Sequence, residues 1–114
     1  MKKRKIEDVM DKIGIPECTQ GYECIVEALM LMDEPVWKNA KWMNVYEEIG
    51  RRLGKTGNSV ERAIRYCFEI ARKKAKDQTD VEHYLGSVYT GNHHTLKHFY
   101  KILKREEEDE NSRY

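Results

Sequence analysis

The hydrophobic positions of this chain recur at helical spacing along most of its length. The clearest stripe consists of large apolar side chains three or four positions apart: Trp42, Val45, Tyr46, Ile49 and Leu53. A second stripe falls on one side at about 100° per residue and comprises Val60, Ala63, Ile64, Cys67, Ile70 and Ala71. These two stripes predict two amphipathic helices, joined by the few residues between Leu53 and Val60.

The residues between these two helices are suited to a tight turn. Gly54 directly follows the first stripe, where a residue that tolerates positive φ most often ends a helix. Thr56 can cap the next helix, and Asn58 is a second candidate. Gly50, four positions before Gly54, is a small residue at a place where two steeply crossing helices need a close approach. The pattern predicts a helix-turn-helix whose second helix, from about residue 56 to 74, enters the DNA major groove.

Four further segments show helical spacing of apolar residues. They run from Ile6 to Ile13, from Gly21 to Met32, from Val81 to Leu85 and from Leu96 to Leu103. Glycine or proline follows the first three of them: Gly14, Pro35 and Gly86. The sequence therefore predicts an all-α fold of about six helices with a central helix-turn-helix.

Charge is distributed unevenly, although the formal net charge is only +1. Nine basic residues lie between Arg51 and Lys76, against only Glu61 and Glu69. Basic side chains next to a recognition helix attract DNA phosphates. The candidates for phosphate contact flank the turn and the second helix: Arg51, Arg52, Lys55, Thr56 and Lys73.

The chain of 114 residues is long enough for one domain with a single modest core. We expect a basic N-terminal extension over residues 1–5, the DNA-binding domain over residues 6–105 and a flexible acidic tail over residues 106–114. No apolar run reaches the length of a membrane span, and the basic start is not followed by the apolar core of a signal peptide. We therefore expect a cytoplasmic protein with no membrane partner.

The outward face of the second helix decides between two interpretations. It carries Asn58, Glu61, Arg62, Arg65, Glu69 and Arg72. An ordinary antiparallel helix pair with a polar outer face is the alternative to a DNA-binding unit. The joint spacing of the glycines, Thr56 and the apolar positions, with arginines on the outer face, favours DNA binding.

Other chemistry has weaker support in the sequence. His94 and His98 lie one helical turn apart, with His93 beside them, but no third metal ligand is evident. The three cysteines form no CxxC pair and are expected to be reduced thiols. No Ser-His-Asp order, phosphate loop or cleft-forming carboxylate pair stands out. We expect no enzyme activity, no catalytic residues, no metal site and no cofactor.

Several short matches show a family resemblance that extends over nearly the whole chain from Ile6. Ile13-Gly14-Ile15-Pro16 and Gly21-Tyr22 are similar to the opening of one bacterial domain, and the block Val60-Glu61-Arg62-Ala63-Ile64-Arg65 carries the strongest match. The chain resembles the C-terminal DNA-binding domain of the master regulator of sporulation initiation. The resemblance implies a six-helix all-α fold, regulation of transcription during sporulation, and binding to a TGTCGAA-type box, often as tandem head-to-tail copies.

The resemblance also implies roles for individual residues of the second helix. Glu61 matches a glutamate that accepts a hydrogen bond from a cytosine amino group, and Arg65 matches an arginine that binds guanine O6 and N7. Arg62 matches an arginine nearer the DNA backbone, with a phosphate or structural role. Where the family has another base-reading arginine, this chain has Ser59. Asn58 and Ser59 are therefore candidates for reading different bases in this protein.

The resemblance has consequences for partners as well. No βαβ receiver pattern precedes the domain, so we expect a free-standing relative of the regulator. The family contacts the sigma subunit of RNA polymerase with a segment that corresponds to residues 75–88 here. The alternative function is thus an adaptor of the same fold that binds the sigma subunit, or a related regulator, without reading DNA. We expect double-stranded DNA as the main partner, and a homodimer could form on tandem sites.

Overall fold

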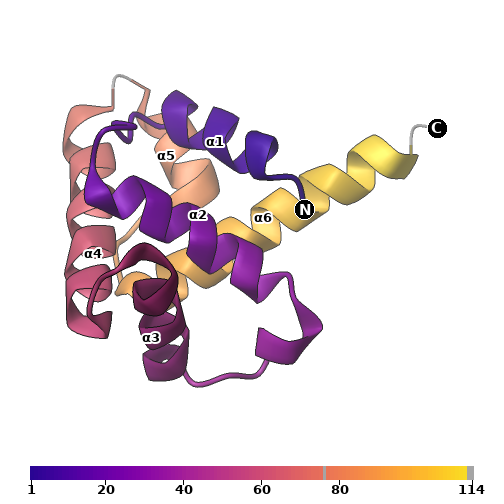
Figure 1. Cartoon of the computed structure of the whole chain (residues 1–114). Helices are drawn as coiled ribbons and strands as arrows, with labels where there is room; N and C mark the ends of the chain where they lie inside the picture. The colour runs from indigo at the N-terminus through magenta and orange to yellow at the C-terminus, as the bar shows by residue number, and fades with distance from the viewer. Residues whose placement is uncertain (76, 113–114) are drawn as a thin grey trace.

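The structure is a computed structural model that describes residues 1–75 and 77–112, and all regular elements of this part are helical (Figure 1). The elements are α1 (Lys3–Lys12), α2 (Gln20–Met32), the short 3-10 helix η1 (Pro35–Trp37), α3 (Trp42–Leu53), α4 (Gly57–Lys74), α5 (Gln78–Leu85) and α6 (Asn92–Ser112). The six α-helices confirm the predicted all-α class. Lys76, Arg113 and Tyr114 lie outside the described residues.

Helix α2 lies at the centre of the molecule and contacts α1, α3, α4 and α6. It is apolar on almost every side, and its buried residues include Tyr22, Ile25 and Leu29. A helix that is hydrophobic nearly all round is buried in a core. Phe68 of α4 and Phe99 of α6 are the largest fully buried side chains that pack in the same core. The recognition helix predicted from the sequence thus packs against the buried central helix.

Helices α3 and α4 form the predicted helix-turn-helix. Gly54 ends α3 with φ +71°, and the N–H of Lys55 donates a 2.7 Å hydrogen bond to the carbonyl of Gly50. Thr56 is the N-cap of α4, and its hydroxyl oxygen accepts a 3.1 Å hydrogen bond from the N–H of Ser59. Both local predictions, a left-handed glycine and a threonine cap, are confirmed.

The prediction that Gly50 allows a close approach between helices is wrong. A Cβ at Gly50 would lie 2.2 Å from the carbonyl oxygen of Lys55, so the turn, and not the facing helix, needs the glycine. The close approach between helices occurs instead at Gly21 of α2. A Cβ there would lie 2.2 Å from the carbonyl oxygen of Ala63 in α4. Helix α4 is thus packed directly on the first turn of α2.

The two charged ends of the chain meet each other in the structure. Helix α1 already begins at Lys3, and α6 continues to Ser112, beyond Glu106 where the sequence predicts a tail (Figure 1). The Lys5 ammonium lies 3.4 Å from Glu106 and 3.7 Å from Glu110. These ion pairs connect the basic start of α1 to the acidic end of α6. The division of the chain into an extension, a domain and a tail stays a prediction.

Gly54→Val is expected to lower the free energy of unfolding by about 1–2 kcal/mol, because a β-branched residue is strained in the left-handed region. No atom lies within 4 Å of a Cβ built at Gly54, so the loss comes from the backbone alone. Thermal unfolding of Gly54→Val and Gly54→Asn measures it, since asparagine tolerates this conformation better. Weaker DNA binding should accompany the lower melting temperature. Equal melting temperatures in the wild type and both variants would contradict the assignment.

Candidate nucleic-acid interface

Helix α4 lies along one side of the molecule, with one face turned away from the other helices (left in Figure 1). The four residues proposed for base reading lie in its first half. Asn58 and Arg65 are exposed, whereas Ser59 and Glu61 are half-buried at the edges of the face. The hydroxyl of Thr56 also donates a 2.9 Å hydrogen bond to the Ser59 hydroxyl. Ser59 is therefore fixed to the cap at the start of the helix.

Glu61 and Arg65 form an ion pair one turn apart on α4. A glutamate four residues before a basic residue is the favourable order along a helix. Both side chains are partly exposed, so the pair contributes only about 0.3–0.5 kcal/mol and exchanges readily for other partners. The pair presents an anionic acceptor and a planar array of donors side by side on the outward face.

Arg51 and Arg52 share one carboxylate at the end of α3. Glu48 is only 8% exposed, and it accepts hydrogen bonds from Arg51 Nε at 2.8 Å and from Arg52 Nε at 3.0 Å. These hydrogen bonds, Arg51 first, hold the pKa of Glu48 below its usual value. Arg52 also lies 3.4 Å from Glu27 of α2. The carboxylates thus position both guanidinium groups beside the turn.

The other residues proposed for phosphate contact differ in exposure. Arg62 and Lys73 are exposed on α4, and Lys55 is half-buried in the turn. Neither Arg62 nor Lys73 forms an ion pair within residues 1–75 and 77–112. The structure therefore places cationic groups at the turn and along the length of α4.

Arg72 has a role that the sequence does not indicate. Helical spacing places it on the outward face, but its guanidinium donates hydrogen bonds of 2.9 Å and 3.0 Å to the carbonyl oxygens of Leu85 and Gly86. It also lies 5.7 Å from the ring centre of Tyr89. These partners belong to the segment at the end of α5 and beyond, which lies next to Arg72 only in the folded chain. The residue pattern around Arg72 therefore could not reveal them. Arg72 connects the end of α4 to the loop before α6.

Asn92 is a second position that the sequence does not indicate. It is buried at the start of α6, and its side-chain amide donates a 2.9 Å hydrogen bond to the carbonyl oxygen of Glu61. Its side-chain oxygen accepts a 2.7 Å hydrogen bond from the Tyr89 hydroxyl. The C-terminal helix thereby holds the turn of α4 that carries the Glu61–Arg65 pair.

Two of the three histidines considered as metal ligands, His93 and His98, have other partners. The His93 ring stacks on Trp42, with 4.7 Å between ring centres and 8° between planes, and burial lowers the pKa of His93. The Nε2 of His98 lies 3.0 Å from the carbonyl oxygen of His83, in hydrogen-bond contact. Within the described residues, no three histidine, cysteine, aspartate or glutamate side chains are arranged to hold a metal ion.

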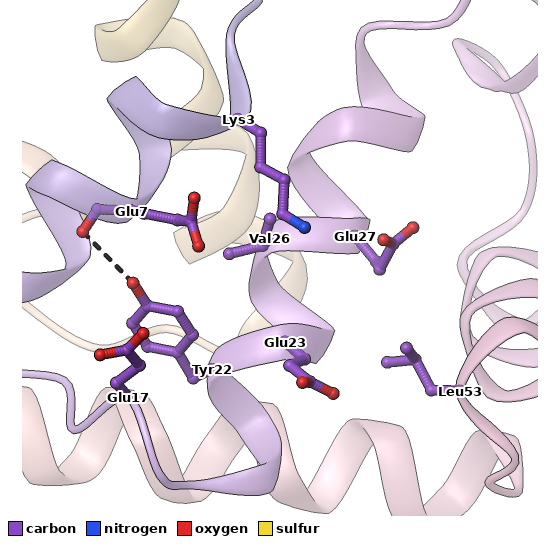
Figure 2. A pocket seen from close by; sticks show the side chains of 8 residues that line it. All are labelled: Lys3, Glu7, Glu17, Tyr22, Glu23, Val26, Glu27 and Leu53. Carbon is purple, nitrogen blue, oxygen red and sulfur yellow. Dashed lines mark hydrogen bonds between the residues drawn. The ribbon is translucent and has the colours of Figure 1, made fainter.

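A pocket between α1, α2 and the end of α3 is unsuited to nucleic acid (Figure 2). Four glutamates line it: Glu7, Glu17, Glu23 and Glu27. The Tyr22 hydroxyl donates a 3.4 Å hydrogen bond to the carbonyl oxygen of Glu7, and burial together with Asp11 raises the pKa of Tyr22 to about 12. This lining repels phosphate groups, in contrast to the outward face of α4.

The fold and the cationic face of α4 define a DNA-binding regulator of the helix-turn-helix class. Residues 6–110 match the family described as Sporulation initiation factor Spo0A C terminal. The match includes the turn and all of α4, and the chain belongs to this family. The family is a DNA-binding regulatory family of sporulation, not a catalytic one. Separately, none of the helices described here is long and apolar enough to cross a bilayer.

Proposed function

We propose that this protein is a sequence-specific transcription regulator that places α4 in the major groove of double-stranded DNA. The observation that carries the proposal is the ion-paired Glu61 and Arg65 on the outward face near the start of the helix. In helix-turn-helix proteins, residues in this part of the recognition helix contact base edges. Family membership supports DNA binding and regulation of sporulation.

The ion pair suits two neighbouring base pairs. Arg65 donates in parallel to guanine O6 and N7, and Glu61 accepts from a cytosine amino group. The pairing keeps the Arg65 guanidinium next to Glu61 on the outward face, and it is weak enough to be given up on DNA binding. Asn58 and Ser59 face the adjacent bases from the first turn of α4.

The phosphate contacts come from the cationic residues around this face. Arg51 and Arg52 each retain N–H donors beyond those used on Glu48, because a guanidinium has five. Lys55 and the Thr56 hydroxyl lie at the turn, and Arg62 and Lys73 lie on α4. We assign these six residues to the DNA backbone.

Lys73→Ala is expected to weaken binding similarly on all sequences and to reduce the slope of log K against log salt by about one unit, because one phosphate contact is lost. Titration of a labelled duplex at four salt concentrations measures the slope. Lys38→Ala is the matched control, since Lys38 is exposed next to η1, away from α4 (Figure 1). An unchanged slope in Lys73→Ala, and in the equivalent variants of Arg51, Arg52 and Lys55, would exclude the backbone assignment.

Selection of bound sequences from a random DNA pool tests the function as a whole. We expect enrichment of a box related to TGTCGAA, altered where Ser59 replaces the family's arginine. We propose that binding to tandem copies brings two molecules together head to tail in the cytoplasm. No enrichment, and no salt-dependent shift of a random duplex, would favour the adaptor alternative.

In the adaptor alternative, the partner would bind the segment 75–88, of which the structure describes every residue except Lys76. This segment contains α5 and Val88, whose side chain is exposed. A contact with the sigma subunit of RNA polymerase would fall on this surface, and it is compatible with DNA binding by α4. Pull-down of purified sigma subunit with the wild type and with Val88→Asp would detect it.

A further inference from the structure

A groove beside α4 differs in charge from the other hollows around the helix. It forms where α2 begins, and its lining includes Thr19 and Gln20 on one side and Ser59, Arg62 and Tyr66 on the other. None of its lining residues is acidic, and Arg62 is basic. Glu47 and Glu61 line the groove on the opposite flank of α4, and four glutamates line the pocket of Figure 2. The electrostatic environment of the groove beside Tyr66 therefore favours a polyanion more than that of the two glutamate-lined hollows.

Tyr66 is an unusual residue for the surface of a helix. Its side chain is 59% exposed, whereas the other large apolar residues of α4, such as Ile64 and Phe68, are buried. It lies one turn after Arg62 and about two turns after Ser59, on the same side of the helix. Within the described part of the chain its hydroxyl has no hydrogen-bond partner. Core packing gives no reason for a tyrosine at this position.

We propose that Tyr66 is a DNA-contacting residue that binds the sugar–phosphate backbone of the strand beside α4. Its hydroxyl donates a hydrogen bond to a phosphate oxygen, and its ring packs against a deoxyribose. This inference rests on the proposed function, since it requires α4 in the major groove. In the same groove, the Thr19 hydroxyl donates to the carbonyl of Pro16 at 2.7 Å and the Ser59 hydroxyl accepts a hydrogen bond from Thr56, whereas the Tyr66 hydroxyl has no partner among the described residues. Backbone contacts of this kind fix the depth and register of a recognition helix.

Tyr66→Phe and Tyr66→Ala test the contact. Tyr66→Phe should bind specific and unrelated duplexes about tenfold more weakly, because it loses a hydrogen bond to a charged acceptor. Tyr66→Ala should bind more weakly still. Neither variant should change which base pairs are preferred. Val36→Ala is the control for removal of an exposed apolar side chain, since Val36 lies in η1, away from α4 (Figure 1).

Duplexes with one neutral methylphosphonate each locate the phosphate. At one position the substitution should weaken the wild type about tenfold and leave Tyr66→Phe unaffected, because both changes remove the same hydrogen bond. Wild-type affinity of Tyr66→Phe, while Arg65→Ala loses base preference, would overturn the Tyr66 contact alone. A changed base preference in Tyr66→Phe would also overturn it, since the hydroxyl would then read a base. Absence of any duplex binding by the wild type would overturn both this inference and the proposed function.

Discussion

Gly21→Ala is expected to lower the free energy of unfolding by about 3 kcal/mol and the melting temperature by roughly 10 °C. The added Cβ would lie 2.2 Å from the carbonyl oxygen of Ala63 and 2.5 Å from the sulfur of Cys67. A backbone carbonyl cannot turn away as a flexible side chain can, so α2 and α4 must separate. Thermal and urea unfolding measure the loss. DNA binding should weaken as well, because a displaced α4 no longer holds the proposed DNA-contacting residues in place.

Gly57→Ala is the matched control for this substitution. Gly57 is also helical, but the nearest atom to its added Cβ is the Cγ of the exposed Glu47 at 3.3 Å, which can move. We expect Gly57→Ala to be close to wild type in stability. The double variant Gly21→Ala/Cys67→Ala separates the two obstacles. Recovery of stability in it would show that the sulfur, and not the carbonyl of Ala63, sets the helix distance, against our explanation.

Arg65→Ala is expected to lose about 10- to 100-fold of preference at a single base pair, since an arginine–guanine pair is worth about 1–3 kcal/mol of discrimination. Binding to unrelated DNA should weaken much less. A panel of duplexes, each with one base pair changed, measures both effects. Glu61→Gln should relax the adjacent position, because it removes the anionic acceptor. If Arg65→Ala leaves the whole panel unaltered, α4 does not read DNA through this residue.

Ser59→Arg extends the same panel. The wild type should tolerate changes at the base pair that faces Ser59, and Ser59→Arg should restore the family's preference there. The new side chain gives up only the exposed hydroxyl contact with Thr56, so the fold should be retained. Arg62→Ala belongs in the same experiment. A uniform loss supports its backbone assignment, whereas a loss at one base pair would transfer a reading role to it.

The parts of the fold that were predictable from the sequence depend on local chemistry. Gly54 and Thr56 act through their own backbone and neighbours, so their types alone indicate a helix end and a helix start. The spacing of Val60 and Ile64 indicates the buried side of α4 for the same reason. The family resemblance, on the block from Val60 to Arg65, added the class of the domain, which the match over residues 6–110 confirms.

The features that were not predictable depend on contacts between segments far apart in the sequence. The spacing of residues along the chain carries no information about such contacts. Gly50 and Gly21 are both small, but only the folded chain shows that one serves the turn and the other the crossing of α2 and α4. In the sequence, Arg72 looks like the other arginines of α4, and only its hydrogen bonds to the chain after α5 distinguish it. The assignments of individual residues to bases and phosphates stay predictions, because they concern a partner molecule.

The hydrogen bond from Asn92 to the carbonyl of Glu61 spans 31 positions of the sequence. It limits how freely the proposed recognition helix can be transplanted. A peptide that contains only α3 and α4 lacks Asn92, as does a chimaera that grafts the outward face of α4 onto another scaffold. In both, the turn with Glu61 and Arg65 is free to fray. An engineer who wishes to change the DNA box should therefore substitute residues within the whole domain, and keep the start of α6 intact.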